Sequence, residues 1–222
     1  MAGRVNLRLF YGGLGVVALI GAGAIWMASS RAQGTQVQIL EAPVPVGTST
    51  FPGFVIGSDS APVEIVEYAD FECPACAAFT ILAGPDIKQR LVLTGLARWR
   101  FRGYPLHQQS LLPHHAARCA GEQGLFWEMH DLLMHYQTDW ITSRRQLGKF
   151  REYAQASGVK LDDYDECMRE GRYASQILAT RDEIAGSVNA TPTFDIGDVR
   201  LVGAQPFDTI AKYVRLAADT SR

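Results

Sequence analysis

The chain has 222 residues, of which 47% are hydrophobic, and this length and composition suit one globular domain with additional segments. Its formal net charge of −2 excludes the strongly basic surface that nucleic-acid binding requires, so no nucleic-acid partner is expected. The four cysteines form an even number, which permits complete disulfide pairing outside the cytoplasm.

Residues 1–30 are predicted to form a membrane anchor or a signal segment. Arg4 and Arg8 precede Leu9–Ala28, a run of twenty residues without a charge, which is about the length of a membrane-spanning helix. Because the basic residues lie mainly before the run, we expect the amino terminus in the cytoplasm and the remainder exported. A cleaved signal peptide is the alternative, since small residues follow the run, although the run exceeds the usual signal core.

Residues 31–52 are rich in Ser, Thr, Gly and Pro and lack a helical or strand period, so an extended linker is predicted there. The folded domain is then expected to occupy residues 53–222. Within it, Pro62–Tyr68 has the composition of a buried strand, and a helix is predicted to begin at the cysteines that follow. Ala97–Pro105 alternates basic and aromatic residues with a period of two, which predicts a second strand.

The central part of the domain, about 107–187, is predicted to be almost wholly helical, because apolar residues recur there at helical spacing. Strands return at TPTFDIG and VRLVG, with Gly197 and Asp198 between them as a hairpin turn. A final amphipathic helix is expected from about Pro206 to Ala218. The order of elements is therefore β-α-β, a helical block, and β-β-α.

Cys73 and Cys76 form a CPAC motif at the predicted start of a helix. Unpaired backbone N–H groups and the positive end of the helix dipole stabilise a thiolate there. Cysteines in such motifs reach pKa values of about 3.5 to 7.5, against about 8.5 for a free thiol. Stabilising the thiolate makes the disulfide easier to reduce, and the protein becomes a better oxidant of other thiols. Cys76 would be the resolving thiol, and Pro74 suits the first helical turn.

Two other interpretations of the CPAC motif remain open. The motif could be half of a zinc site that His114 and His115 complete, or it could be an inert structural disulfide. The other two cysteines, Cys119 and Cys167, are isolated within predicted helices, whereas a zinc knuckle has a second closely spaced pair. A redox pair without a metal is therefore the favoured interpretation.

Five stretches of the chain, taken together and in order, carry a family resemblance: SDSAPVEIVEYADFECPACAAF, RFRGYPL, AARCAGEQGLFWEMHDLL, ATPTFDIG and LVGAQPFDTI. In these stretches the chain resembles exported thiol-disulfide oxidoreductases of the DsbA type, within the thioredoxin superfamily. The resemblance implies an α/β fold, a thioredoxin fold with an inserted all-helical domain, here preceded by the single N-terminal transmembrane or signal helix. It also implies that the chain introduces disulfides into extracytoplasmic proteins by thiol-disulfide exchange.

The resemblance assigns roles to residues around the cysteines. It implies a cis peptide bond at Thr191–Pro192, whose loop would bind an extended substrate together with Pro74 and Ala75. It makes Glu67 a buried acid that exchanges protons with Cys76, and an exposed strand glutamate is the alternative. The Pro-Ala pair replaces the Pro-His pair of the best-known member, so an extremely oxidising potential is not implied.

Exported relatives of this type often have cysteines at the positions of Cys119 and Cys167, and this implies a structural disulfide between them. On the chain-entropy account, cross-linking a loop of about 49 residues stabilises the fold by about 4 kcal/mol. A redox or regulatory role for this bond is the alternative.

The CPAC motif and the family resemblance together predict that the protein is an enzyme, a membrane-anchored thiol-disulfide oxidoreductase of the bacterial cell envelope. Its expected partners are cysteine-containing exported proteins and, as reoxidant, a membrane quinone-linked thiol oxidase. No dissociable cofactor is expected, because the Cys73–Cys76 disulfide carries the electrons. The catalytic domain would lie in the periplasm or another extracytoplasmic space, anchored in the inner membrane or secreted after signal cleavage. A disulfide isomerase, a dedicated thiol reductant and a non-enzymatic periplasmic metallochaperone are the alternatives.

Overall fold

The computed structural model describes residues 37–39 and 51–220 of the chain. The run Leu9–Ala28, predicted as an anchor or signal, lies outside these residues, as does most of the predicted linker. Within the two described ranges, no helix combines the length and the apolar character that crossing a membrane requires.

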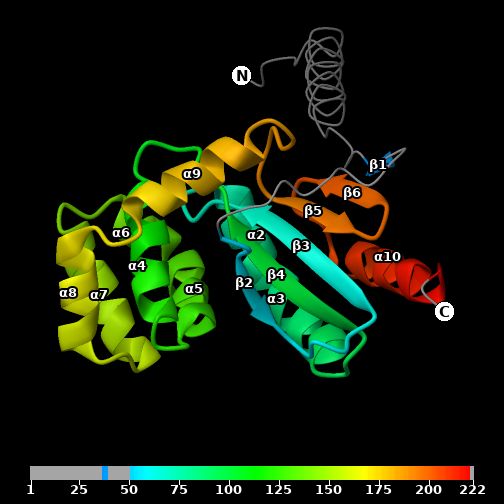
Figure 1. The fold of residues 1–222 in the computed structure, drawn as a ribbon, viewed down its shortest axis with the longest axis horizontal. Coiled ribbons are helices and arrows are strands. Elements are labelled where there is room, and N and C mark those ends of the chain that lie inside the picture. The colour runs from blue at the N-terminus through cyan, green and yellow to red at the C-terminus, as the bar shows by residue number, and fades with distance from the viewer. Residues whose placement is uncertain (1–36, 40–50, 221–222) are drawn as a thin grey trace, which may run out of the picture. The chain divides into compact units, whose positions relative to one another are not determined.

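A mixed sheet forms the centre of the described fold (Figure 1). Its strands follow the order β1-β6-β5-β3-β4-β2, and they span Val37–Ile39 (β1), Phe54–Ile56 (β2), Val63–Ala69 (β3), Ala97–Gly103 (β4), Thr193–Ile196 (β5) and Val199–Val202 (β6). Strands β3 and β4 are parallel, and the other neighbouring strands are antiparallel. The parallel pair needs a crossover connection, and a helical segment between the two strands supplies it.

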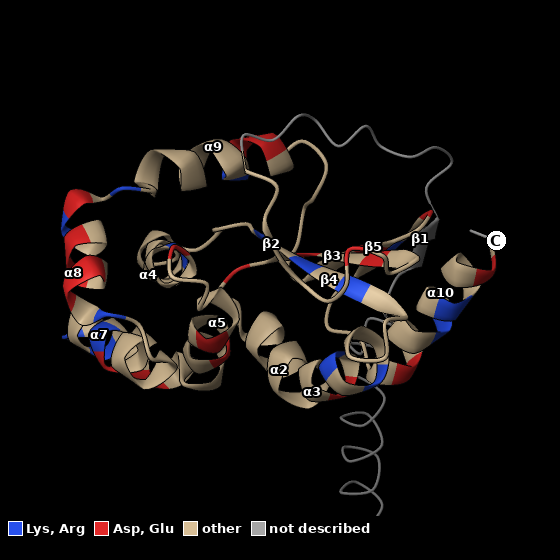
Figure 2. Ribbon diagram, turned by 60° about the horizontal axis from the view of Figure 1, so that its bottom comes forward, with Lys and Arg blue, Asp and Glu red and all other residues tan. Residues whose placement is uncertain are grey.

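That crossover consists of helices α2 (Pro74–Leu82) and α3 (Gly84–Ile87) and a π-helical turn (Lys88–Val92). Helix α10 (Phe207–Thr220) packs beside α3, and all three helices lie on one face of the sheet (Figure 2). Alternate residues of β3 point to this face, because side chains along a strand alternate between its two sides. The core that fills the space between this sheet face and the helices includes Ile65, Phe79, Ile87, Trp99, Phe194, Ile210 and Val214.

The helical block lies between β4 and β5 in the chain. Its helices are α4 (Leu111–Gly121), α5 (Phe126–His135), α6 (Gln137–Ile141), α7 (Gln146–Ser157), α8 (Leu161–Glu170) and α9 (Ala174–Ile184). A second core joins this block to the segment that follows β3, and it includes Phe71, Cys73, Cys76, Cys119, Met129, Trp140, Phe150, Tyr164 and Cys167. The helical block therefore packs directly against the CPAC motif.

Neither edge strand of the sheet, β1 or β2, was predicted from the sequence, and both pair antiparallel with their neighbours. Strand β1 lies inside the predicted linker 31–52 and pairs with β6, with Val37 opposite Leu201. The predicted hairpin turn at Gly197 and Asp198 does join β5 to β6. Gly197 has a φ of 57°, a left-handed conformation that glycine adopts without a steric penalty.

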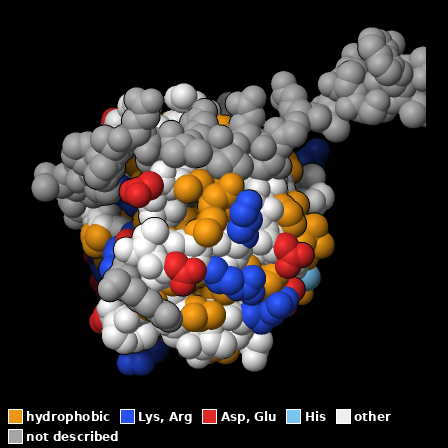
Figure 3. Space-filling model, turned by 90° about the vertical axis from the view of Figure 1, so that its right-hand side faces the viewer, with side chains coloured by type: hydrophobic (Ala, Val, Ile, Leu, Met, Phe, Trp, Pro, Cys, Tyr) orange, Lys and Arg blue, Asp and Glu red, His pale blue; other side chains and the backbone are white. Residues whose placement is uncertain are grey.

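The end of the molecule that carries α10 has a mixed surface (Figure 3). Basic, acidic and hydrophobic side chains are interspersed on this face. Ion pairs between neighbouring strands show the same local balance, since Glu64 of β3 lies 2.7 Å from Arg98 and 2.8 Å from Arg100 of β4. Such an arrangement is typical of an ordinary solvated surface.

Candidate active site

The CPAC motif lies where the chain leaves β3 and enters α2. Pro74 is the first residue of α2, where its missing N–H leaves no helical hydrogen bond unmade. Cys73 is the N-cap residue, with extended backbone angles of φ −76° and ψ 119°. Its carbonyl accepts hydrogen bonds from the N–H groups of Cys76 (3.1 Å) and Ala77 (3.2 Å). Cys73 therefore lies at the electropositive end of a nine-residue helix.

The two thiols of the motif have opposite acidities. The pKa of Cys73 is lowered to about 5, chiefly because the Cys76 thiol donates a hydrogen bond to its sulfur. Although burial opposes this shift, Thr191 and the backbone N–H groups of Cys76 and Ala75 add to it. Burial raises the pKa of Cys76 well above its usual value, and the hydrogen bond to Cys73 and the Cys73 charge raise it further. At neutral pH Cys73 is therefore a thiolate, while Cys76 remains a thiol.

The loop before β5 faces the reactive sulfur. The Thr191–Pro192 peptide bond is cis, and the protonated Cys73 thiol donates a hydrogen bond to the Thr191 carbonyl, with an S–O distance of 3.3 Å. The Gly203 N–H donates to the Pro192 carbonyl at 2.8 Å, which ties the loop to the end of β6. Pro74 is exposed and Ala75 is half-buried. The four residues predicted to contact a substrate therefore lie around the Cys73 sulfur.

Glu67 lies in β3, at the centre of the sheet, and its side chain is fully buried rather than exposed. Trp99 Nε1 donates a hydrogen bond to Glu67 Oε2 at 3.0 Å, whereas Oε1 has no partner among the described residues. Burial raises the pKa of Glu67 to about 8, because the carboxylate loses its hydration. The Glu67 charge in turn raises the pKa of Cys76, so the two buried acids are electrostatically coupled.

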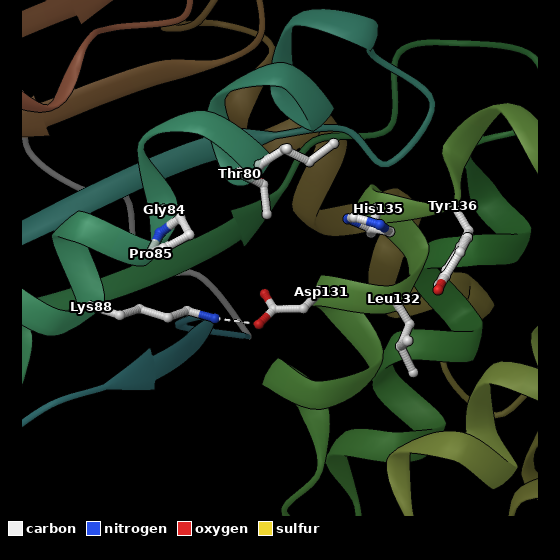
Figure 4. Close-up of a pocket in the computed structure, with 9 residues that line it drawn as sticks. Thr80, Gly84, Pro85, Lys88, Asp131, Leu132, His135 and Tyr136 are labelled. Carbon is white, nitrogen blue, oxygen red and sulfur yellow. Dashed lines mark hydrogen bonds and ion pairs between the residues drawn. The ribbon is translucent and has the colours of Figure 1, made fainter.

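A cavity of about 520 Å³ opens between α2, α3 and α5 (Figure 4). Lys88 and Asp131 meet across it, with Nζ 2.5 Å from Oδ2. The remaining lining residues are Thr80, Ile81, Gly84, Pro85, Leu132, His135 and Tyr136. The Lys88 charge lowers the pKa of Glu67 and the Asp131 charge raises it, and each effect is smaller than that of burial. The two charges therefore act on the acidity of Glu67 in opposite directions, Lys88 from the crossover and Asp131 from the helical block.

Asp70 and Gln137 hold the turn between β3 and α2. Gln137 of α6 donates two hydrogen bonds from Nε2, to the carbonyls of Phe71 (2.7 Å) and Cys73 (2.9 Å). Asp70 is fully buried, and its Oδ1 accepts a hydrogen bond from the Glu72 N–H at 3.0 Å. The role of Gln137 was not predicted from the sequence. Nothing in the local pattern of its helix indicates that the side-chain amide contacts a turn 64 to 66 positions away.

The other two cysteines are bonded to each other. Cys119 of α4 and Cys167 of α8 form a disulfide, whereas Cys73 and Cys76 are free thiols. Among the described residues, the one cluster of three possible metal ligands is this disulfide pair with His115, and the CPAC cysteines are not part of it. While the two sulfurs are bonded to each other, they offer no thiolate to a metal.

Comparisons with known proteins agree with this geometry. A family model described as Thioredoxin matches residues 49–215. The Na(+)/H(+) antiporter NhaA 3 of Salinispora tropica is 33% identical over 193 residues, which cover 85% of this chain and 28% of the antiporter. The putative protein-disulfide oxidoreductase RC0029 of Rickettsia conorii is 24% identical over 170 residues, covering 76% of this chain and 61% of that protein. The chain thus matches only part of the length of each of these relatives.

Solved structures show the same fold. The crystal structure of Wolbachia pipientis alpha-DsbA1 superimposes with a TM-score of 0.69 and 20% identity, covering 75% of this chain and 91% of that chain. Oxidised BdbD from Bacillus subtilis gives a TM-score of 0.68 and 25% identity, covering 74% of this chain and 92% of that chain. The predicted thioredoxin fold of the DsbA type is confirmed, and the chain belongs to the thioredoxin family.

Proposed function

We propose that the chain is a thiol-disulfide oxidoreductase that introduces disulfides into extracytoplasmic proteins. The observation that carries this proposal is the opposite acidity of two adjacent thiols at the start of α2, a Cys73 thiolate beside a protonated Cys76. The names of the Rickettsia relative and of the DsbA structures support the same chemistry. The oxidising direction rests on the low pKa of Cys73.

The effect of the low pKa of Cys73 on the reduction potential can be worked out from its shift relative to an ordinary thiol. At pH 7, a thiol whose pKa is about 5 rather than 9.0 stabilises the reduced protein by about 3 kcal/mol through its ionisation. For a two-electron couple this corresponds to a reduction potential about 60 mV more oxidising. The Cys73–Cys76 disulfide is therefore expected to accept electrons from ordinary protein thiols.

The reaction proceeds by two exchanges. A client thiolate attacks the Cys73 sulfur of the Cys73–Cys76 disulfide, the new S–S bond joins client and Cys73, and Cys76 leaves as a thiolate that takes up a proton. A second client thiol then loses its proton and attacks the client sulfur of the mixed disulfide, and Cys73 leaves as a thiolate. Two electrons have passed from two client thiols to the cysteine pair. The low pKa of Cys73 speeds the second exchange, because a more acidic thiol leaves faster.

Glu67 is assigned the proton transfers at Cys76. Cys76 is buried and must gain a proton when it leaves and lose one when the disulfide forms again. Glu67, buried and with a pKa near 8, can hold or release a proton close to neutral pH. Its unpartnered Oε1 is free to accept a hydrogen bond.

Client polypeptides are proposed to bind in extended form along the loop at Thr191–Pro192. The carbonyl of Thr191 lies beside the Cys73 sulfur, so a client backbone paired with this loop would bring its own sulfur to Cys73. Exposed Pro74 and half-buried Ala75 would form the opposite side of this binding surface. Recognition through the main chain would permit many different clients.

The proposal for the cellular setting rests on the sequence of the first thirty residues. The run Leu9–Ala28 is proposed to anchor the chain in the inner membrane, with the domain 53–222 in the extracytoplasmic space, where disulfides persist. A membrane quinone-linked thiol oxidase is proposed to reoxidise Cys73 and Cys76. A thiol reagent that cannot cross membranes should label reduced Cys73 in intact cells, and protection until the cells are opened would contradict this orientation.

The oxidised chain, incubated with reduced and unfolded ribonuclease, should restore ribonuclease activity as client thiols disappear. The Cys73→Ser and Cys76→Ser variants should both lack this activity, because neither can form the Cys73–Cys76 disulfide that accepts the electrons of the client thiols. A reduction potential above about −200 mV, measured against a glutathione series, is expected for an oxidase. A value near the −270 mV or so of thioredoxin would instead indicate a reductant.

A further inference from the structure

The sequence neighbours of Cys73 include acidic residues but no basic residue. From Asp70 to Leu82 the sequence contains two acidic residues, Asp70 and Glu72, and no basic residue. Helix α2 has no charged residue, as its uniform colour in Figure 2 also shows. Two carboxylates within three positions of a thiolate oppose its formation, so a positive charge placed beside them from elsewhere in the fold would favour the thiolate.

The loop between β4 and α4 binds both carboxylates. Asp70 Oδ2 accepts hydrogen bonds from the N–H groups of Leu106 (2.8 Å) and His107 (3.2 Å) and from the Ser110 hydroxyl (2.8 Å). Glu72 Oε2 accepts from the Gln109 N–H (2.7 Å) and from the same hydroxyl (3.1 Å). The loop is thus fixed to the turn that presents Cys73.

His107 is the ionisable base that this loop brings to the turn. Its Nδ1 lies 2.7 Å from Asp70 Oδ2, and its side chain is 43% exposed while the Asp70 side chain is fully buried. The Asp70 carbonyl accepts a hydrogen bond from the Cys73 N–H at 3.0 Å. One residue, Asp70, therefore contacts His107 through its carboxylate and Cys73 through its backbone.

The charges that face His107 all favour its protonated form. A hydrogen bond with Asp70 raises the pKa of His107, and the negative charges of Asp70, Cys73 and Glu72 raise it further, although partial burial opposes them. His114, whose Nδ1 lies 4.0 Å from Asp70 Oδ1, is fully buried and has a lowered pKa, so it is neutral near pH 7. The pKa of His107 is raised above its ordinary value of 6.5, so in the range near pH 5, where Cys73 titrates, His107 is the protonated base of this group of residues.

We propose that His107, held by Asp70, is a positioning residue that supplies the counter-charge for the Cys73 thiolate, which the CPAC turn and helix α2 do not contain. The proposal rests on the proposed function, because it explains how this chain keeps Cys73 a good leaving group. Without the His107 charge, the buried Asp70 carboxylate would act unopposed on Cys73. The thiolate would then be less stable, and the disulfide would be a weaker oxidant.

The test is the acidity of Cys73 in the reduced chain, followed by thiolate absorbance at 240 nm against pH, with the reduction potential as a second readout. In His107→Gln, which loses the charge but keeps a hydrogen-bond donor, the acid dissociation constant of Cys73 should fall about threefold to tenfold. The equilibrium constant with glutathione should shift by the same factor, about 15 to 30 mV towards reducing values. Lys212→Gln, which removes a positive charge at an exposed position of α10, is the matched control and should show neither change.

A double variant separates charge from shape. Adding Asp70→Asn to His107→Gln removes the unopposed carboxylate, so the dissociation constant should return towards that of the original chain. If the double variant does not fold, His107→Lys replaces it, and a Cys73 acidity close to the original supports the proposal. An unchanged acidity in His107→Gln, no recovery in the double variant, or a loss in His107→Lys equal to that in His107→Gln would overturn it. Failure of the proposed function would look different, since the original chain would then not oxidise ribonuclease even though Cys73 acidity depends on His107.

Discussion

Replacing Cys76 by alanine tests the cause of the acidity on which the proposed chemistry depends. The largest cause of the low pKa of Cys73 is the hydrogen bond from the Cys76 thiol. A hydrogen bond to a charged group contributes about 1.5 to 3 kcal/mol, which corresponds to about one to two pKa units. Without this donor, Cys73 should titrate at about pH 6 to 7 instead of near 5. Cys76→Ser keeps a hydroxyl donor in the same place, so its effect should be smaller.

The measurement is the thiolate absorbance at 240 nm during a pH titration of each reduced variant, with the rate of alkylation by iodoacetamide as an independent readout. The Cys73→Ser variant should lose the acidic transition and so identifies its source. An equal pKa of about 5 in Cys76→Ala and in the original chain would refute the reasoning. In that case the backbone N–H groups at the start of α2, and not the second thiol, would hold the charge.

Three further predictions concern stability. The pKa of Glu67 is raised in the folded protein, which therefore holds a proton that the unfolded chain loses above about pH 4.5. The free energy of unfolding should decrease as the pH rises from about 4.5 to 8, by about 3 kcal/mol at pH 7 in urea unfolding. This decrease should be absent in Glu67→Gln. Gln137→Ala removes the side-chain donor of the Phe71 carbonyl, while the Cys73 carbonyl keeps its two backbone donors, so the variant should cost about 1 to 3 kcal/mol in the same assay; a cost below about 0.5 kcal/mol would contradict a buried hydrogen bond to Phe71. Replacing Cys119 and Cys167 by alanine should lower the unfolding free energy by about 4 kcal/mol while ribonuclease oxidation continues, whereas loss of oxidation in a folded variant would indicate a redox role.

Local sequence patterns were sufficient to predict the order of the main strands and helices, whereas the thioredoxin fold itself was implied by the family resemblance. The β-rich stretch Pro62–Tyr68 corresponds to strand β3, observed at Val63–Ala69, and the helix after it begins within the CPAC motif. Such elements are visible because their apolar spacing and helix-start residues lie within a few positions of one another. The position of Glu67 beneath the cysteines came from family resemblance, since periodicity alone left its burial undecided.

Contacts between distant segments were not visible in the sequence. His107 and Asp70 are 37 positions apart, and they meet because β4 runs parallel to β3, so that both strands end at the same edge of the sheet. Strand β1 escaped prediction for a related reason, since three residues of a Ser, Thr, Gly and Pro-rich segment become a strand through pairing with β6. In both cases the structure depends on a contact with a distant segment of the same chain, which the local sequence does not indicate.

The helical block affects the chemistry of the cysteine pair although the four residues assigned to substrate contact lie outside it. Cys76 is fully buried in a core that also contains Cys119 and Cys167, and burial is the largest cause of its raised pKa. Gln137 of the same block donates a hydrogen bond to the carbonyl of Cys73, and the charge of Asp131 raises the pKa of Glu67. Without the helical block this core would lose part of its apolar lining, the burial that raises the pKa of Cys76 would weaken, and the difference in acidity between the two thiols would shrink. The block is therefore part of the redox site, because it supplies the low-polarity surroundings that keep one thiol protonated beside its ionised neighbour.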